Sequence, residues 1–247
     1  MLFINTNTNH SFTFEPYEHN VIYGPNGSYK SMFLKYLARE VSQHPFAAVA
    51  DPNTTSDIVI PKYQLITNTP NTVENLESIL LTLHRMQSES TDPKFQKVLE
   101  MCFSLLKSGY NLDFQFDTTG QPTLNGKSFT NTSNGEPLYM SDGQLQASKL
   151  MLNTFLTMIQ FKDVSLSMAL VGMEKEPLHL LYDDLESHLS LNAQSKIVSD
   201  ILRMVEKIDY LYNYLEAPDT HISIVTHSPM IYEAMKYNDA KMTEMDI

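Results

Sequence analysis

The chain has 247 residues, of which 42% are hydrophobic and 19% charged, with a net charge of −12 and one cysteine. Such a composition fits a globular protein with a substantial core, and the single cysteine excludes a disulfide framework or a cluster of thiolate metal ligands. The net negative charge argues against strong sequence-independent binding of nucleic acid, because such binding needs lysine and arginine side chains to neutralise the phosphates. A local basic surface remains compatible with this net charge.

No apolar run approaches the roughly 18 residues that a membrane-spanning helix needs. The first ten residues also lack the basic region and apolar run of a secretory signal. We therefore expect a cytoplasmic protein that does not insert into a membrane.

The first quarter of the chain predicts strands on either side of a glycine-rich stretch. Three short strands are predicted at residues 1–5, 11–16 and 20–24. The stretch GPNGSYKS follows, and apolar residues at helical spacing then predict a helix from Ser31 to about Val41. A further strand is predicted within residues 57–67.

The middle of the chain predicts two amphipathic helices, each with one apolar stripe. The stripes are Val73, Leu76, Leu80 and Leu83 in the first helix, and Val98, Cys102, Leu105 and Leu106 in the second, which ends at Gly109. Alternating residues and turn formers at about residues 111–130 then predict a β-hairpin. We expect a helical insertion at about residues 68–109 and this hairpin to lie within a single domain, residues 1–247.

The second half of the chain alternates helices with buried strands. Helices are predicted from Gly143 to about Phe161, from about Asn192 to Val205, and at residues 230–237, and strands at LHLLYDD (178–184) and HISIVTHSP (221–229). Strands that alternate with helices predict an α/β fold with a mostly parallel central sheet.

The stretch VIYGPNGSYKS departs at one position from the phosphate-loop pattern G-x-x-x-x-G-K-[ST], because Tyr29 stands where the pattern has glycine. In a phosphate loop, backbone N–H groups surround the phosphates, Lys30 reaches the β- and γ-phosphates, and the Ser31 hydroxyl binds Mg²⁺. The residues assigned to nucleotide binding here are Asn26, Gly27, Ser28, Tyr29, Lys30 and Ser31. The alternative is a simple turn between strand and helix, with Lys30 exposed.

The stretch LLYDDLESHL places acidic residues at the end of a buried strand, where open α/β sheets build their sites. Asp183 is the candidate ligand of Mg²⁺, a cation that prefers oxygen donors. Asp184 is the candidate for orienting the attacking water. The alternative is that the two residues only cap a helix.

Two further motifs follow the same logic. In MSDGQLQ, Ser141 and Gln144 form a capping-box pattern, and Gly143 would let an external phosphate approach the helix N-terminus. In IVTHSP, a strand ends at His227, whose neutral ring could both donate to and accept from a γ-phosphate or water. Capping alone and a structural histidine are the respective alternatives.

The order of these motifs resembles that of ABC-type ATPases in the P-loop NTPase superfamily, in the SMC/RecF/OLD-like branch rather than the transporter branch. GPNGSYKS resembles the GxNGxGKS loop, and MSDGQL resembles the LSGGQ or LSDG signature. LLYDDLESHLS resembles D/E-E-P-E-x-H-L-H, with Glu186, His188 and Leu189 in register, and IVTHSP resembles the THSP at the switch histidine. The departures from these patterns are Tyr29 for glycine, Asp184 for glutamate and Leu185 for proline.

The resemblance implies an ABC-ATPase-like head domain, with a mostly parallel central sheet, an N-terminal antiparallel β part and a short helical insertion. It further implies a head-to-tail homodimer that holds two ATP molecules. Lys30 and Ser31 of one chain would bind each nucleotide, which the signature of the other chain would cover. That signature comprises Ser141, Asp142, Gly143 and Gln144.

The resemblance also implies roles around the nucleotide. Asp183 and Gln64 would help Ser31 to hold Mg²⁺, Asp184 would be the catalytic carboxylate, and His227 would sense the γ-phosphate. The short insertion disfavours a long-armed clamp. Because OLD-like relatives often carry a nuclease domain, we expect a separate effector protein, such as a nuclease or toxin, in DNA maintenance or anti-phage defence.

Two other functions stay open on the sequence alone. One is the ATP-binding subunit of an ABC transporter. The other is a nucleotide-binding scaffold with impaired catalysis, which the substitutions at Tyr29 and Asp184 favour, so ATP hydrolysis itself is left open.

Overall fold

The computed structural model describes residues 1–49, 61–66, 72–129, 140–170, with backbone alone at 164–170, then 177–212 and 220–245. The chain divides into two compact units. Unit 1 comprises Met1–Thr67, Val164–Glu186 and Asn213–Ile247, and unit 2 comprises Asn68–Asp163 and Ser187–Tyr212. The single domain expected from the sequence stays a prediction.

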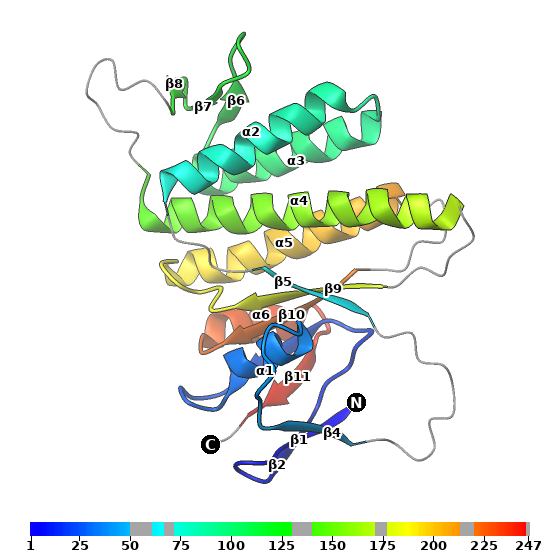
Figure 1. Ribbon diagram of the computed structural model, residues 1–247. Helices are drawn as coiled ribbons and strands as arrows, with labels where there is room; N and C mark the ends of the chain where they lie inside the picture. The colour runs from blue at the N-terminus through cyan, green and yellow to red at the C-terminus, as the bar shows by residue number, and fades with distance from the viewer. Residues whose placement is uncertain (50–60, 67–71, 130–139, 171–176, 213–219, 246–247) are drawn as a thin grey trace. The chain divides into compact units, whose positions relative to one another are not determined.

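Unit 1 contains a five-stranded sheet in the order β11-β3-β10-β9-β5, and every neighbouring pair is parallel (Figure 1). The strands are β3 (Asn20–Tyr23), β5 (Lys62–Ile66), β9 (Leu178–Asp183), β10 (His221–Thr226) and β11 (Lys241–Glu244). The central strands β9 and β10 are buried along almost their whole length, as parallel strands covered on both faces are. The structure confirms the mostly parallel sheet. Residues 57–60 and 67 of the predicted strand lie outside the described residues.

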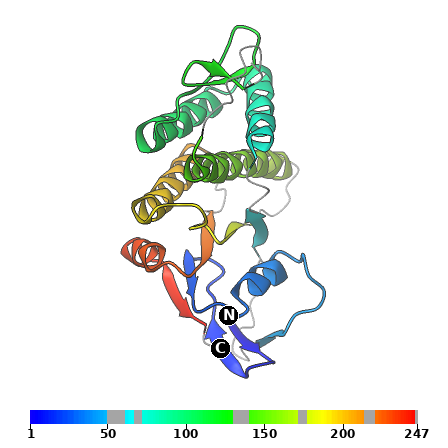
Figure 2. The same cartoon turned by 90° about the vertical axis from the view of Figure 1, so that its left-hand side faces the viewer.

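Helices α1 (Lys30–Leu37) and α6 (Pro229–Tyr237) lie on opposite faces of this sheet (Figure 2). The connection through α1 leads from β3 toward β5, and the connection through α6 leads from β10 toward β11, at the other edge. Right-handed crossovers that run in opposite directions along a sheet place their helices on opposite faces. The phosphate-loop candidate therefore leads from a central strand into a helix that covers one face.

A second sheet in unit 1 is antiparallel, in the order β2-β1-β4. It is formed by β1 (Leu2–Asn5), β2 (His10–Thr13) and β4 (Phe46–Val49). The structure confirms an N-terminal antiparallel part, but the sequence analysis did not predict β4 or β11. Each has one buried residue out of four, β4 at its first position and β11 at its third, so neither shows the alternation that reveals a strand.

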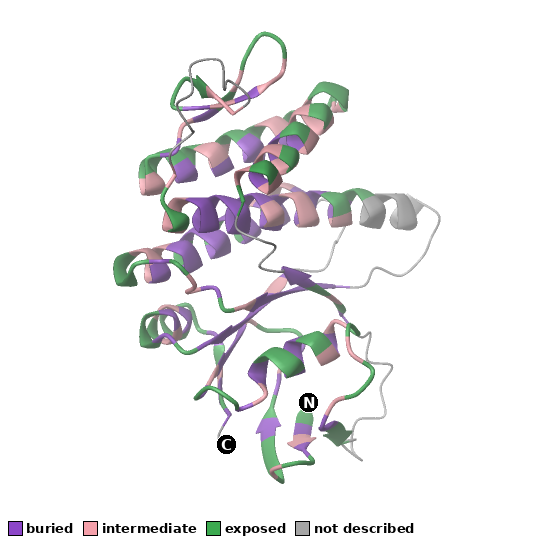
Figure 3. Cartoon of the chain, turned by 60° about the vertical axis from the view of Figure 1, so that its left-hand side comes forward, coloured by how far each residue is buried: buried purple, intermediate pink, exposed green. Residues whose placement is uncertain are grey.

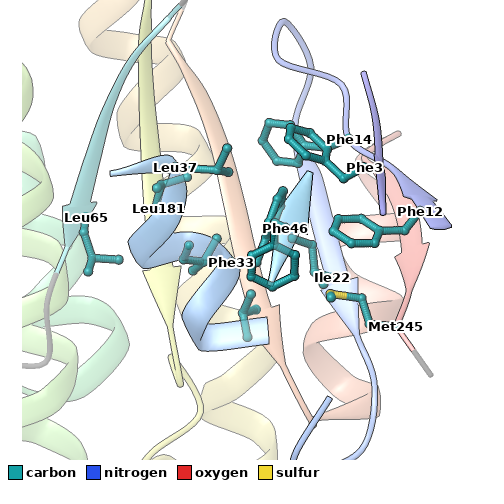
Figure 4. Packing of buried hydrophobic residues seen from close by; sticks show 12 residues of the cluster. Phe3, Phe12, Phe14, Ile22, Phe33, Leu37, Phe46, Leu65, Leu181 and Met245 are labelled. Atoms are coloured by element: carbon teal, nitrogen blue, oxygen red, sulfur yellow. The ribbon is translucent and has the colours of Figure 1, made fainter. Parts of the chain in front are cut away.

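An aromatic cluster joins α1 to the antiparallel sheet (Figure 4). The ring of Phe33, on α1, lies 4.8 Å from the Phe12 ring, 5.0 Å from Phe3 and 5.2 Å from Phe46, each in an edge-to-face arrangement. Such pairs add to the free energy gained by burying the rings. The helix that follows the glycine-rich loop is thus anchored two residues after Ser31.

Helix α1 is shorter than the sequence analysis predicted. It ends at Leu37, and Arg39 adopts a left-handed conformation with φ of 59°. The N–H of Glu40 then donates to the carbonyl of Lys35 at 2.9 Å, which closes the helix. Val41 continues the apolar spacing but lies beyond this closure, and that is why the predicted end was wrong.

Unit 2 contains four helices among its described residues, and Figure 3 shows that α4 is buried on all sides at residues 145–152, after an exposed start. They are α2 (Val73–Glu89), α3 (Pro93–Tyr110), α4 (Asp142–Leu170, of which 142–163 belong to unit 2) and α5 (Leu191–Tyr212). The predicted stripes on α2 and α3 are buried, apart from the half-buried Val73. Helices α4 and α5 extend beyond their predicted ends at Phe161 and Val205.

The predicted hairpin at 111–130 is instead a three-stranded antiparallel sheet. Its strands are β6 (Phe114–Phe116), β7 (Pro122–Leu124) and β8 (Lys127–Ser128). The additional turn is Asn125-Gly126, where both residues have positive φ, the geometry of a two-residue type I′ turn. The single-hairpin prediction overlooked this Asn-Gly signal. No helix within the described ranges is long and apolar enough to cross a membrane.

We predict that His179 makes the folding stability of unit 1 depend on pH. Burial lowers the pKa of this histidine from 6.5 to about 3, and its ring bonds the Pro16 carbonyl and the Ser223 hydroxyl. Between pH 6.5 and about 3, this histidine is protonated in the unfolded chain and neutral in the folded chain. The stability contributed by the neutral ring is therefore complete above pH 6.5 and falls, by about 1.4 kcal/mol per unit, as the pH drops toward 3.

Denaturant unfolding at pH 7, 6 and 5 tests this. His179→Asn should flatten the decline seen in the wild type, whereas His10→Asn, at an exposed position of the same unit, should not. Equal pH slopes for wild type and His179→Asn would contradict the prediction.

Candidate functional site

The glycine-rich loop connects β3 to α1 in a backbone conformation that suits glycine at two positions. Gly27 has φ of 86°, and Tyr29 has φ of 64° and ψ of 12°, in the left-handed region. A non-glycine residue in that region costs about 1 kcal/mol. Tyr29 therefore adopts a conformation that glycine would adopt without strain, at the position where the phosphate-loop pattern has glycine.

The side chain of Tyr29 is half-buried and packs against the aromatic cluster of unit 1. It is not among the described residues that line the neighbouring cavity. The ring therefore leaves free the space beside the loop where phosphates would lie. Sequence alone could not show this, because the direction of the ring depends on the sign of φ at this residue.

Lys30 is buried, with 4% of its surface exposed, and its side chain folds back into the loop. Its Nζ donates to the carbonyls of Gly24 and Pro25, both at 2.7 Å, and to the Ser28 hydroxyl at 3.1 Å. Burial lowers the pKa of Lys30, and the negative charges of Asp183 and Glu186 act in the opposite direction. This geometry excludes the alternative of an exposed lysine on a plain turn.

Ser31 and Asp183 meet across 152 residues of sequence. The Ser31 hydroxyl donates to Oδ1 of Asp183 at 2.8 Å, which joins the first turn of α1 to the end of β9. A hydroxyl and a carboxylate at this spacing are the hard oxygen donors that suit Mg²⁺. The residues therefore fit the metal predicted from the sequence.

Asp184 follows directly, with φ of 52°, a left-handed conformation that aspartate tolerates better than most residues. The turn leaves Asp184 exposed and sends the next side chain, Leu185, into the core. Leu185, which stands where the motif of the resembling ATPases has proline, is therefore buried in the core.

These residues surround a cavity of about 460 Å³ at the carboxyl ends of β3, β9 and β10. Its described lining is Asn26, Ser31, Asp183, Asp184, Val225 and His227. The volume falls in the range of about 300–1,000 Å³ that is common for ligand sites. The place is also where open α/β sheets bind ligands.

His227 follows β10 and turns one ring nitrogen toward the loop. Its Nδ1 lies 3.0 Å from the carbonyl oxygen of Gly24 and 3.3 Å from Nζ of Lys30. The carbonyl only accepts and the ammonium only donates, so the two contacts favour opposite tautomers of the ring. We assign the hydrogen to Nδ1, which donates to Gly24, because that contact is the shorter of the two. In the neutral ring, Nε2 is then a proton acceptor.

Gln64 is not brought to this cavity. It lies in the middle of β5, exposed, opposite Leu180 of β9, and is not among the described lining residues. Asp183 lies three positions farther along β9, about 10 Å at the rise of a parallel strand. The strand continues past Gln64 to Ile66, so Gln64 does not sit at a strand end as the expected Mg²⁺ role requires.

The signature candidates lie in unit 2 at the start of α4. Their capping box is formed, with the Gln144 N–H donating to the Ser141 hydroxyl at 3.2 Å and the Ser141 N–H to Oε1 of Gln144 at 3.0 Å. A Cβ added at Gly143 would lie 2.8 Å from the carbonyl oxygen of His188. Ser141 and Asp142 are exposed. Ser141 and Gln144 therefore cap α4 within their own chain, as the alternative interpretation expected. A role of these residues toward a second copy of the chain stays a prediction.

The sequence analysis named Glu186 within a motif but assigned it no role beside the cavity. Oε1 of Glu186 accepts hydrogen bonds from the Thr226 hydroxyl at 2.8 Å and from the backbone N–H of His227 at 2.6 Å. The sequence motif placed Glu186 near Asp184, but the pairing with the end of another strand is a tertiary feature.

No protein-family profile and no curated protein matches the sequence. Among solved structures, the chain is similar to a metal-chelate type ABC transporter in an inward-facing conformation, with 15% identity and a TM-score of 0.39. The match covers 93% of this chain and 72% of that chain. A similarity with this identity and TM-score supports no statement about function. A functional assignment for this chain therefore depends on the geometry described above.

We predict that Tyr29→Gly is more stable than Tyr29→Ala by about 1 kcal/mol. Both variants remove the ring, so their difference isolates the left-handed backbone, which glycine adopts without strain. Denaturant midpoints of the two variants measure it. Equal stability, or a more stable alanine variant, would show that Tyr29 does not hold this conformation.

Proposed function

We propose that the chain is an ABC-type ATPase that binds ATP and Mg²⁺ in the cavity of unit 1. The observation that carries the proposal is the hydrogen bond from Ser31 to Asp183 beside the buried Lys30. The hydroxyl and the strand-end carboxylate line one cavity, and the buried ammonium of Lys30 lies inside the loop that precedes Ser31. That combination suits a triphosphate with its metal ion.

Each loop residue has a defined task in this proposal. The backbone N–H groups of Asn26 to Lys30 would bind phosphate oxygens at the positive end of α1. Lys30 would exchange the carbonyls of Gly24 and Pro25 for the β- and γ-phosphates. Ser31 and Asp183 would hold Mg²⁺, which supplies charge neutralisation at these phosphates.

Hydrolysis would use two further polar side chains that line the cavity, those of Asp184 and His227. Asp184 is exposed at the lining and would orient the attacking water, while Nε2 of His227 would accept a hydrogen bond from that water or sense the γ-phosphate. Asp184 is one methylene shorter than glutamate, which moves the carboxylate by more than the roughly 1 Å that can cost a hundredfold in rate. Binding without turnover would therefore identify a scaffold rather than an active ATPase.

We further propose that two copies close head-to-tail on ATP. Ser141 and Asp142 are exposed at the start of α4, a long helix whose N-terminus favours anions. The Ser141 oxygen accepts one bond within its own chain, and its hydroxyl hydrogen can still donate to a phosphate.

The finer assignment follows from the motifs MSDG and THSP, which favour the SMC/RecF/OLD-like branch. On that basis the ATPase would drive or regulate a separate effector, such as a nuclease or toxin, in DNA maintenance or anti-phage defence. Closing and opening of the dimer would be the signal to that effector.

Lys30→Ala should weaken binding of a non-hydrolysable ATP analogue with Mg²⁺ between about tenfold and a hundredfold, because it removes charged hydrogen bonds to phosphates. Isothermal titration calorimetry measures the affinity, phosphate release measures turnover, and a melting curve confirms folding. Lys35→Ala, at an exposed position of the same helix, is the matched control and should bind normally. Wild-type affinity in folded Lys30→Ala would refute the assignment of the loop.

The dimer is tested in an Asp184→Asn background, which should trap the closed form. Light scattering after size exclusion should then show two chains per particle with ATP and Mg²⁺. Adding Ser141→Asp should abolish that dimer, and adding Ser141→Asn should preserve it. Both residues cap helices well, so only the negative charge against the triphosphate differs. A dimer that tolerates Ser141→Asp would argue against the signature role.

A further inference from the structure

We infer that Glu186 is a positioning residue that fixes His227 for the proposed ATP hydrolysis. The inference rests on the proposed function and adds to it a residue that is neither a phosphate ligand nor a lining residue of the cavity. Glu186 acts through the backbone of the turn that presents His227.

The contacts of Glu186 are concentrated on one short turn. Its Oε1 accepts from the Thr226 hydroxyl at 2.8 Å and from the His227 N–H at 2.6 Å. The same Thr226 oxygen accepts from the N–H of Ser228 at 2.9 Å. The Ser228 hydroxyl in turn accepts from the N–H groups of Met230 and Ile231, which begin α6. One carboxylate oxygen thus determines where the chain leaves β10 and enters α6.

Glu186 and Gly24 together hold His227 at two points. The backbone N–H is bound by Glu186, and Nδ1 of the ring lies 3.0 Å from the Gly24 carbonyl of the phosphate loop. With these two points fixed, Nε2 is the ring nitrogen left for the cavity that His227 lines. A hydrogen bond to a charged carboxylate is stronger than a neutral one, so the turn should be well ordered.

The second carboxylate oxygen of Glu186 indicates that this residue is not explained by its contribution to folding stability alone. Oε2 is buried and has no hydrogen-bond partner among the residues that the structure describes. A buried acceptor without a partner costs free energy, and a neutral amide could accept the same two bonds at its oxygen, although less strongly than the carboxylate. The negative charge has a second effect, because together with Asp183 it favours the charged form of Lys30 against burial.

The position of Glu186 in the chain links His227 to the acidic residues that follow β9. It follows β9 within three residues of Asp183 and two of Asp184, so one segment holds the proposed metal ligand, the proposed catalytic carboxylate and the contact to His227. Any shift of that segment when nucleotide binds is passed to His227 through the 2.6 Å bond.

The test compares Glu186→Ala, Glu186→Gln and His227→Ala with wild type. Glu186→Ala should lower kcat between about tenfold and a hundredfold and change KM little, since it misplaces a group that acts on the reacting water. Glu186→Gln, which keeps an acceptor oxygen, should recover most of that loss. The double variant Glu186→Ala/His227→Ala should be no slower than His227→Ala alone, because Glu186 acts through His227. Glu233→Gln, at an exposed position on α6, should leave kcat unchanged.

A second readout needs neither nucleotide nor turnover. In a ¹H–¹⁵N NMR spectrum, the amide proton of His227 should be shifted downfield by its bond to the carboxylate and should move upfield in Glu186→Ala. An unchanged resonance would overturn the contact itself. A changed resonance with additive kinetic effects, or with unaltered kcat, would overturn the positioning role. A wild type that neither binds nor hydrolyses ATP would instead refute the proposed function, and the role of Glu186 with it, while leaving the contact intact.

Discussion

The hydrogen bond between Ser31 and Asp183 is the contact on which the arrangement of the cavity depends. It joins the first turn of α1 to the carboxyl end of β9, two elements that are separated by most of the chain. The parallel pairing of β10 with β3 and with β9 already places three strand ends side by side, and the bond holds the start of α1 against them. The acidic pair follows β9 and the histidine follows β10, so both lie beside the loop that carries Lys30.

The bond can hold Ser31 beside Asp183 only if α1 keeps its position on the sheet. The aromatic cluster fixes that position. Phe33 lies on α1 and packs edge-to-face with rings from β1, β2 and β4. The antiparallel sheet thus acts as a support for the helix that carries Ser31. Tyr29 adds its ring to the same cluster, so the residue that departs from the phosphate-loop pattern contributes to anchoring the loop.

Sequence reasoning could place Lys30, Ser31, Asp183 and His227 together because the ends of parallel strands must meet at one edge of the sheet. It could not place Gln64, since that depends on the register between β5 and β9, which no local pattern encodes. The bond between Glu186 and the turn after β10 was hidden for the same reason. Other misses were local: β4 and β11 do not alternate between buried and exposed residues, whereas Asn125-Gly126 carried a clear turn signal that was overlooked.

The carbonyl of Met245 occupies the space that a side chain at position 24 would need, and the Met245 N–H donates to the Tyr23 carbonyl at 2.8 Å. The backbone that leaves β11, the edge strand of the parallel sheet, therefore lies directly against the first residue of the loop. A displacement of that edge would change the conformation of the glycine-rich loop. A fluorophore or affinity handle attached just beyond β11 would consequently report on the loop, and would also disturb it.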